Sequence, residues 1–211
     1  MMVTGSMASP TTQIAPPAAI PPPIRQTWPP IQSQWTYEDW LHLPDDGFRY
    51  EVLNGELHMT PPPTIAHQNA TTKLARRIGS FAERSGAGIV LASPVGVRLP
   101  GHPVPVQPDV IFIRADRRDI LGKDYVEGAP DLVVEVLSPS NWLYDRREKL
   151  LAYQQAGVPE YWIVDTRART VEVRTLEEGR YTLVAEFGSG EAAHSQAIPG
   201  FDVAVDDLFE M

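Results

Sequence analysis

Short apolar runs separated by polar, turn-forming segments fill much of the chain beyond residue 87. Two of them, at residues 110–113 and 132–137, are so rich in Val, Ile and Leu that they indicate central strands of a sheet covered on both faces. The charged, turn-rich residues 114–129 between them predict a loop. Similar apolar runs predict further strands at 88–93, 95–99, 160–165, 170–176 and 180–187, and a terminal cap at 201–209.

Two segments have the period of a helix instead. Between Thr64 and Ser85 the apolar residues form a single stripe, made of Ala70, Leu74, Ile78 and Phe81. Gly86 is placed to end this helix, because glycine readily adopts the left-handed conformation of a helix end. A second helix is predicted over residues 142–156, with Gly157 at its end.

The residues before the long helix predict a hairpin over about residues 49–59. Asn54-Gly55 separates two short apolar runs there, and this pair favours a type I′ turn because both turn positions need a positive φ. A short helix capped by Thr36 precedes it and runs through Leu41. The order helix, three strands, helix, strand in the middle of the chain predicts an α/β (α+β) fold, a mixed β-sheet flanked by helices.

Composition divides the chain into a tail and one domain. Residues 1–33 hold a single charged side chain, Arg25, among many prolines. Such a segment cannot bury enough apolar surface to offset its ordering entropy, so we expect it to be disordered. Residues 34–211 are predicted to form one domain, since 211 residues that are 43% hydrophobic and 21% charged can build a single core.

The chain contains no cysteine, which excludes disulfides and thiolate metal sites. It also lacks an apolar run long enough to cross a membrane and the pattern of a secretory signal. We therefore expect a cytoplasmic protein that makes no membrane contacts.

The formal net charge of −9 argues against a protein that wraps nucleic acid nonspecifically. Such affinity depends on neutralising phosphates with Lys and Arg. The net charge does not exclude a local basic groove. Lys73, Arg77 and Arg84 share one face of the long predicted helix, where they either follow a nucleic-acid backbone or are simply solvated.

Each of two predicted central strands carries one carboxylate, Asp109 at the head of the first and Glu135 within the second. An ionised carboxylate in such apolar surroundings is costly unless a cation or hydrogen bonds compensate it. Side chains two apart share a face of a strand, so Asp109 lies with Ile111 and Glu135 lies with Val133. On neighbouring strands, both carboxylates would converge on one hard cation, Mg²⁺ or Mn²⁺. The alternatives are a bond from Asp109 to turn amides after Pro108 and a structural role for Glu135.

Five segments follow one another along the chain: "YEVLNGEL", "PPPTIAHQNA", "QPDVIFI", "PDLVVEVLSPS" and "DRREKLLAYQQAGVPEYWIVD". In this order they resemble the Uma-type restriction endonuclease family, a branch of the PD-(D/E)XK nuclease superfamily. The resemblance covers about residues 36–209. It implies a restriction-endonuclease-like fold, a divalent metal ion, DNA as the substrate and a homodimer.

Carried over onto this sequence, the resemblance implies that Asp109 and Glu135 bind the metal ion, with the Val136 carbonyl as a backbone ligand. The chain departs from the superfamily pattern two residues after Glu135, where Leu137 stands in place of a lysine. An apolar side chain cannot orient water or stabilise a developing charge. The family usually presents its lysine from the following helix, where Lys149 is the matching residue.

Three further site residues have a functional and a structural interpretation. Lys149 either reaches the metal site or pairs with Asp145 on a solvated helix face. Glu51 of the hairpin is a candidate third acid, with Glu56 as its competitor and exposure to solvent as the alternative for both. His67, in the first turn of the long helix, either contacts a phosphate or orients water, or it packs at the edge of the core.

The residues and the resemblance together predict a Mg²⁺-dependent DNA endonuclease that hydrolyses phosphodiester bonds. Two other hypotheses stay open. One is a nuclease fold retained as a binding or assembly module without turnover, which Leu137 and the acidic balance favour and which Asp109 and Glu135 count against. The other is a metal-dependent hydrolase that acts on a different phosphoester.

Overall fold

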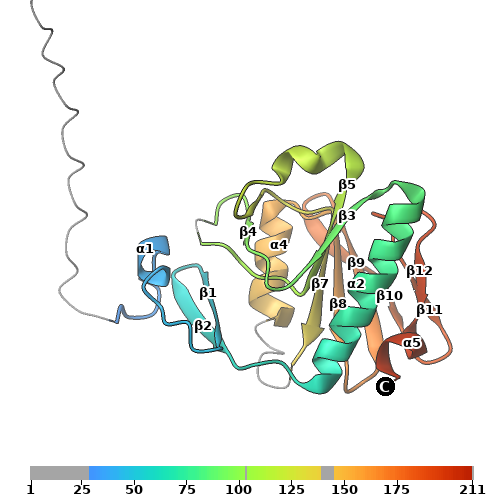
Figure 1. Cartoon of the computed structure of the whole chain (residues 1–211), viewed down its shortest axis with the longest axis horizontal. Coiled ribbons are helices and arrows are strands. Elements are labelled where there is room, and N and C mark those ends of the chain that lie inside the picture. Colours follow the sequence, from blue (N-terminus) through green and yellow to red (C-terminus); the bar gives the residue numbers. More distant parts are fainter. Residues whose placement is uncertain (1–28, 103, 139–144, 211) are drawn as a thin grey trace, which may run out of the picture.

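The computed structural model describes residues 29–102, 104–138 and 145–210, which build up around a six-stranded sheet (Figure 1). The strands, in the order in which they lie side by side, are β10 (Arg180–Phe187), β9 (Thr170–Glu177), β8 (Glu160–Asp165), β7 (Leu132–Leu137), β5 (Val110–Arg114) and β3 (Gly88–Ala92). The predicted tail lies outside the described residues up to residue 28. Gln32, at its end, hydrogen-bonds to the backbone of Leu57.

The sheet is mixed, as the sequence predicted. β7 and β8 are parallel, whereas the other neighbouring strands are antiparallel. A parallel pair requires a crossover connection, and this one contains the π-helical turn η2 (Asp145–Lys149) and the helix α4 (Leu150–Ala156). Gly157 ends α4 with a φ of 80°. The predicted beginning of this helix, residues 142–144, lies outside the described residues.

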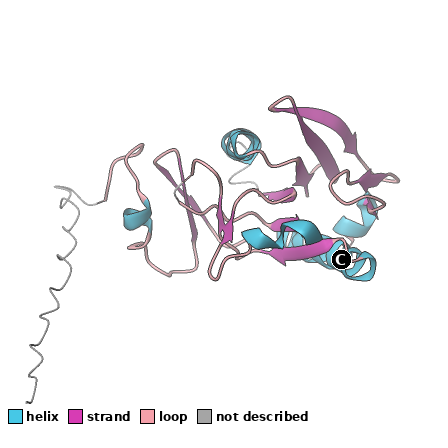
Figure 2. Cartoon of the chain, turned by 90° about the horizontal axis from the view of Figure 1, so that it is seen from above, coloured by secondary structure: helices cyan, strands magenta, loops and turns pink. Residues whose placement is uncertain are grey.

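Helices cover both faces of the sheet (Figures 1 and 2). One face packs on α2 (Ile65–Ser85), α5 (Val205–Phe209), β11 (Ala192–His194) and β12 (Asp202–Ala204). The other face packs on α4. Phe112 and Val134 point to the first core, whereas Ile111 and Val133 point to the second. Successive residues of a strand alternate between its faces, which explains why both runs are apolar throughout.

α2 follows the predicted helix closely. The Thr64 side chain caps its beginning by accepting a hydrogen bond from the His67 amide at 3.2 Å. Gly86 ends it in the left-handed region, with a φ of 68°. The buried stripe contains Ala70, Leu74, Ile78 and Ala82, while Phe81 beside it is only partly buried.

A hairpin and a short helix form a separate lobe at one end of the sheet, which we call the N-terminal arm (residues 36–60; Figure 1). It comprises α1 (Tyr37–Trp40), β1 (Arg49–Leu53) and β2 (Glu56–Thr60). Asn54 and Gly55 have φ values of 52° and 78°, as a type I′ turn requires. Thr36 and Asp39 form a capping box at the start of α1.

Two sequence predictions need correction. Within residues 95–99 only β4 (Val97–Arg98) is a strand, and it pairs with β6 (Val126–Glu127) rather than with the central sheet. Residues 114–129, predicted to be a loop, contain β6 and the 3₁₀ helix η1 (Ala115–Ile120). The two short strands pair because each contributes an apolar side chain to the core. Val97 and Val126, which are partners in this pair, are 0% and 1% exposed.

The basic face of α2 is used within the molecule. Arg77 forms an ion pair with Asp207 of α5 at 2.6 Å, and the Lys73 ammonium donates to the Glu210 carbonyl. These two side chains therefore anchor the C-terminal segment to α2. No helix in the described part of the chain has the length and hydropathy of a membrane span.

Candidate active site

The register of the central strands places the two predicted carboxylates opposite each other. Val110 of β5 pairs with Val134 of β7, so one step further along the same register Asp109 faces Glu135. Residues directly opposite in an antiparallel pair project on the same face. Both carboxylates therefore lie on the α4 side of the sheet, at the end where β5 begins.

Asp109 is held by three donors from three different elements. It accepts hydrogen bonds from the Val136 amide at 2.8 Å and from Arg49 of β1 at 3.3 Å. Nε2 of His67, on α2, lies 3.1 Å from its Oδ2. Burial alone would raise the pKa of Asp109, but the hydrogen bond and charge of His67 and the charge of Arg49 outweigh it and lower this pKa to about 2. The carboxylate is thus ionised and does more than bind turn amides after Pro108.

Glu135 shares one of its oxygens between two donors on the crossover connection. Its Oε1 lies 3.0 Å from the Lys149 ammonium and 2.6 Å from the Tyr153 hydroxyl. All three side chains are buried, with residue exposures of 1%, 2% and 0% for Glu135, Lys149 and Tyr153. An ammonium and a carboxylate are this deeply buried only when they are paired.

Glu51 completes the cluster from the N-terminal arm. One of its oxygens lies 3.1 Å from the Lys149 ammonium, and the other accepts the Gln107 amide at 2.8 Å. It is 1% exposed, whereas its competitor Glu56 is exposed. The hairpin acid that meets the predicted site is therefore Glu51.

Lys149 bridges two acids that are far apart in the sequence. The end of η2 directs its ammonium between Glu51 and Glu135. The alternative of a solvated pair with Asp145 is wrong for Lys149, because a lysine that is 2% exposed does not lie on a solvated face. The Asp145 side chain lies outside the described residues. Leu137, at the usual lysine position, is buried in the core beside α4.

His67 belongs to the cluster rather than to the general core. The first turn of α2 brings it to Asp109, and the Thr71 hydroxyl lies 3.5 Å from its Nδ1. It is 4% exposed. Its ring thus links the start of α2 to the head of β5.

The sequence analysis missed two residues of this cluster, Arg49 and Tyr153. Arg49 precedes Glu51 by two positions in β1 and therefore projects on the same face. Tyr153 follows Lys149 by one helical turn. Both spacings are visible in the sequence. They indicate site residues only once Glu51 and Lys149 are known to lie in the cluster.

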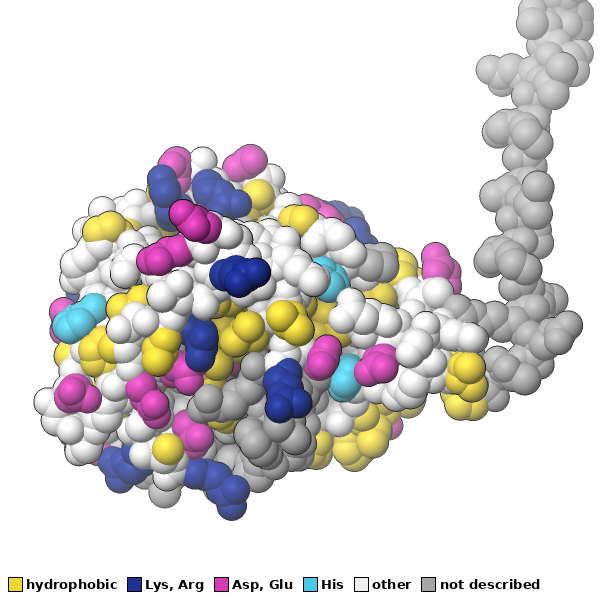
Figure 3. All heavy atoms as spheres, turned by 180° about the vertical axis from the view of Figure 1, so that it is seen from behind, with side chains coloured by type: hydrophobic (Ala, Val, Ile, Leu, Met, Phe, Trp, Pro, Cys, Tyr) yellow, Lys and Arg dark blue, Asp and Glu magenta, His cyan; other side chains and the backbone are white. Residues whose placement is uncertain are grey.

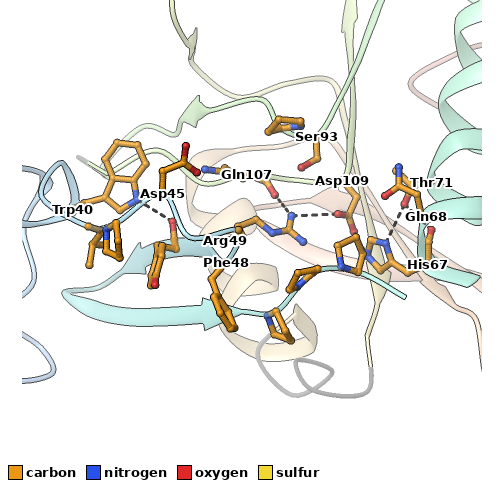
Figure 4. A pocket seen from close by; sticks show the side chains of 18 of the residues that line it. Trp40, Asp45, Phe48, Arg49, His67, Gln68, Thr71, Ser93, Gln107 and Asp109 are labelled. Atoms are coloured by element: carbon orange, nitrogen blue, oxygen red, sulfur yellow. Dashed lines mark hydrogen bonds and ion pairs between the residues drawn. The ribbon is translucent and has the colours of Figure 1, made fainter. Parts of the chain in front are cut away.

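A cleft of about 800 Å³ opens between the N-terminal arm and the sheet. Asp109, Arg49 and His67 line one part of it, as Figure 4 shows. Glu135 and Lys149 are not among its lining residues. Asp109 is therefore the carboxylate through which a ligand in the cleft would first meet the cluster.

The carboxylate and carbonyl oxygens of the cluster are the kind of ligand that a hard divalent cation takes. Within the described residues, no three Asp, Glu or His side chains are arranged as a ready metal cage. Mg²⁺, however, is commonly held by one or two carboxylates, with waters and substrate oxygens completing its shell. Asp109 and Glu135 match that pattern. The Val136 amide points to Asp109, and the carbonyl of a strand residue projects to the same side as its amide, so it suits the backbone ligand.

The family follows from a comparison with known protein families. The profile of Uma2, described as "Putative restriction endonuclease", matches residues 37–206. The chain belongs to the Uma2 family. The matched region runs from α1 into α5 and includes all the residues of the cluster, and this family membership supports a nuclease.

A solved structure agrees with the Uma2 assignment in fold. It is titled a putative nuclease belonging to DUF820 from Anabaena variabilis, and it matches with a TM-score of 0.68 at 18% sequence identity. The match covers 85% of this chain and 98% of that chain. It confirms the predicted restriction-endonuclease-like fold. A comparison with curated proteins gives no match.

Proposed function

We propose that this Uma2 protein is a divalent-metal-dependent DNA endonuclease that hydrolyses phosphodiester bonds. The observation that carries the proposal is the meeting of Glu51, Asp109 and Glu135 with one buried lysine, Lys149, at the end of the central sheet. Three carboxylates in so small a volume repel one another unless cations compensate them. Clusters of perturbed, buried charges of this kind are typical of active sites.

Asp109, Glu135 and the Val136 carbonyl would hold Mg²⁺ or Mn²⁺. When bound, such an ion lowers the pKa of a coordinated water and stabilises negative charge on a phosphodiester. The low pKa of Asp109 keeps this ligand ionised without metal, since His67 and Arg49 outweigh the cost of its burial. The site is thereby ready to accept a cation at neutral pH.

Lys149 supplies the positive charge that Leu137 cannot. Its ammonium lies against Glu135, where it can orient the attacking water or stabilise the charge that develops on the phosphate. Glu51 holds this ammonium from the other side. His67 fixes the orientation of Asp109 from α2. Each supporting residue thus contacts one of the residues that would act on the substrate.

The test is cleavage of supercoiled plasmid by purified protein with Mg²⁺ or Mn²⁺, in parallel with Glu135→Ala. Glu56→Ala is the matched control, because Glu56 is an exposed acid of the same hairpin as Glu51. We expect nicking by the wild type and by Glu56→Ala, and its loss in Glu135→Ala. Equal nicking by all three proteins would show that the activity is not that of this site.

The rival hypothesis is a nuclease fold kept as a binding or assembly module, which the apolar Leu137 favours. Calorimetric titration with Mn²⁺ separates the two. We expect binding by the wild type and its loss in Asp109→Ala. Absence of binding in the wild type, together with intact plasmid, would favour the module.

A further inference from the structure

We propose that the cleft binds an unpaired DNA strand, in which a base stacks on Phe48 and an adjoining phosphate contacts Arg49. This inference rests on the proposed nuclease function and names its substrate class. It follows from how the two ends of the cleft differ. Figure 4 shows Trp40 toward one end and Asp109 and His67 toward the other, with Phe48 and Arg49 between them.

The first end of the cleft is aromatic. Trp40 donates its indole N–H to the Tyr50 carbonyl at 2.9 Å and stacks on Tyr37 with ring centroids 5.8 Å apart. Phe48, which also lines the cleft, is 40% exposed, although it is a large apolar side chain. Exposed aromatic rings are the platforms on which single-stranded nucleic acids stack their bases.

The second end of the cleft can hold an anion. Nη1 of Arg49 donates to the Gln107 carbonyl at 2.8 Å and to Asp109. Nε and Nη2 make no hydrogen bond to any described residue, and the side chain is 19% exposed. Guanidinium groups bind phosphate oxygens through such paired N–H donors. The acids and the histidine that line the cleft are Asp45, Asp109 and His67, and Arg49 is the one arginine or lysine among its described lining residues.

The cleft is small in comparison with a DNA duplex. Its volume of about 800 Å³ falls within the range of about 300–1,000 Å³ that is usual for small-ligand sites. A DNA duplex is far wider, since its major groove alone measures about 12 Å. Asp109 and Glu135 are 2% and 1% exposed. A ligand can therefore reach these carboxylates only through a narrow opening, which a single strand fits more easily than a duplex does.

The charge of the protein argues against binding by a broad electrostatic track. With a net charge of −9, the chain has little general attraction for nucleic acid. On the face drawn in Figure 3, basic and acidic side chains are interspersed and form no continuous basic band. Binding that depends on stacked bases and one phosphate contact suits such a surface better than binding by a broad electrostatic track.

Fluorescence anisotropy tests the stacking contact. The probes are a fluorescein-labelled single strand of mixed sequence and its blunt duplex, in EDTA, with the full chain. We expect the single strand to bind at least about tenfold more tightly than the duplex. Phe48→Ala should weaken single-strand binding by about fivefold to one hundredfold, as removal of one stacking platform does. Phe48→Trp should retain it, whereas Phe48→Leu should not.

Leu183→Ala is the matched control, because Leu183 is an exposed apolar side chain, 49% accessible, on the edge strand β10 away from the cleft. It should leave binding unchanged. Arg49→Gln tests the phosphate contact through salt. The slope of log affinity against log salt concentration should fall by about 0.7, the value for one phosphate of a single strand. Phe48→Ala should leave that slope unchanged.

The outcomes separate this inference from the proposed function. Equal affinity for duplex and single strand, or no loss in Phe48→Ala when circular dichroism shows a folded protein, overturns the inference even if plasmid is nicked. Selective single-strand binding that depends on Phe48 supports it even if no DNA is cut, and then only the proposed chemistry fails. With Mg²⁺, a duplex containing an unpaired bubble should be cut within the bubble.

Discussion

Glu135 and Glu160 are both buried carboxylates on neighbouring central strands, each 1% exposed. Their partners differ in kind. Glu135 meets the ammonium of Lys149 and the hydroxyl of Tyr153, close to two more acids. Its surroundings therefore concentrate charge.

Glu160 instead meets backbone amides at the opposite end of the strands. It accepts from Gln196 at 2.7 Å and from Ala197 at 2.6 Å, and also from the indole of Trp162. Burial raises the pKa of Glu160, and these hydrogen bonds offset the effect only in part. This carboxylate ties a loop to the sheet.

A buried acid in an apolar strand is therefore not sufficient evidence for a functional site. Both glutamates satisfy the rule that a buried carboxylate needs partners. Only Glu135 has a charged partner, the Lys149 ammonium, so only there would a ligand change the balance of charge. The predictions below test that difference.

The largest difference concerns cleavage. Glu135→Gln should lower the cleavage rate by about 100-fold to 1,000-fold, because it removes a carboxylate that would hold the metal ion, and the loss of one such electrostatic stabiliser of a transition state has an effect of about this size. Glu160→Gln should leave the rate unchanged when measured below its melting temperature. Rates on labelled DNA with Mg²⁺ provide the check, and an equal loss in both variants would refute the distinction between the two acids.

The second difference concerns stability without metal. Lys149→Met leaves Glu51 and Glu135 facing each other without their cation, and breaking a buried pair in this way costs about 3–5 kcal/mol. Urea denaturation in EDTA measures the free energy of unfolding. Lys123→Met, at an exposed lysine, should change it by no more than about 0.5 kcal/mol. A similarly small change in Lys149→Met would contradict the charge balance described for the cluster.

Glu160→Gln should destabilise the fold by about 1–3 kcal/mol, the cost of leaving a buried hydrogen-bond partner unsatisfied. Since the pKa of Glu160 in the folded state lies above its ordinary value of 4.5, its contribution is complete below that pH and declines as the pH rises through the folded pKa. The gap in stability between wild type and variant should therefore narrow from acid to neutral pH. A gap that widens over this range would mean that the folded protein favours the ionised form.

The smallest effect is expected for Tyr153→Phe, which removes one hydrogen bond to Glu135 and should cost about 1 kcal/mol. Because that bond positions an acid of the cluster, cleavage should also fall, by about tenfold at most. Tyr181→Phe is the control, since its hydroxyl donates to the Val158 carbonyl at 2.9 Å, away from the cluster. It should lose comparable stability and keep the full rate. A normal cleavage rate in Tyr153→Phe would show that the Tyr153 hydroxyl is not needed for cleavage and that this side chain only packs in the core.

The sequence predicted most of the central fold because local signals there agreed with the packing. The caps Thr64 and Gly86, the Asn54-Gly55 turn and the apolar runs of β5 and β7 act within a few residues. The pairing of β4 with β6 was not predicted, because each strand is too short to have a readable period. The two strands also lie far apart in the sequence.

By itself the sequence determined which strands carry acids and which face of its strand each acid occupies, because the alternation of side chains is a local property of a strand. It brought forward Asp109, Glu135, Lys149, Glu51 and His67 as candidates. Only the tertiary structure decided that Lys149 lies between Glu51 and Glu135, and that Arg49 faces the cleft. These contacts join β1, β5, β7 and the crossover connection, and their geometry depends on how the elements pack, which no local pattern encodes.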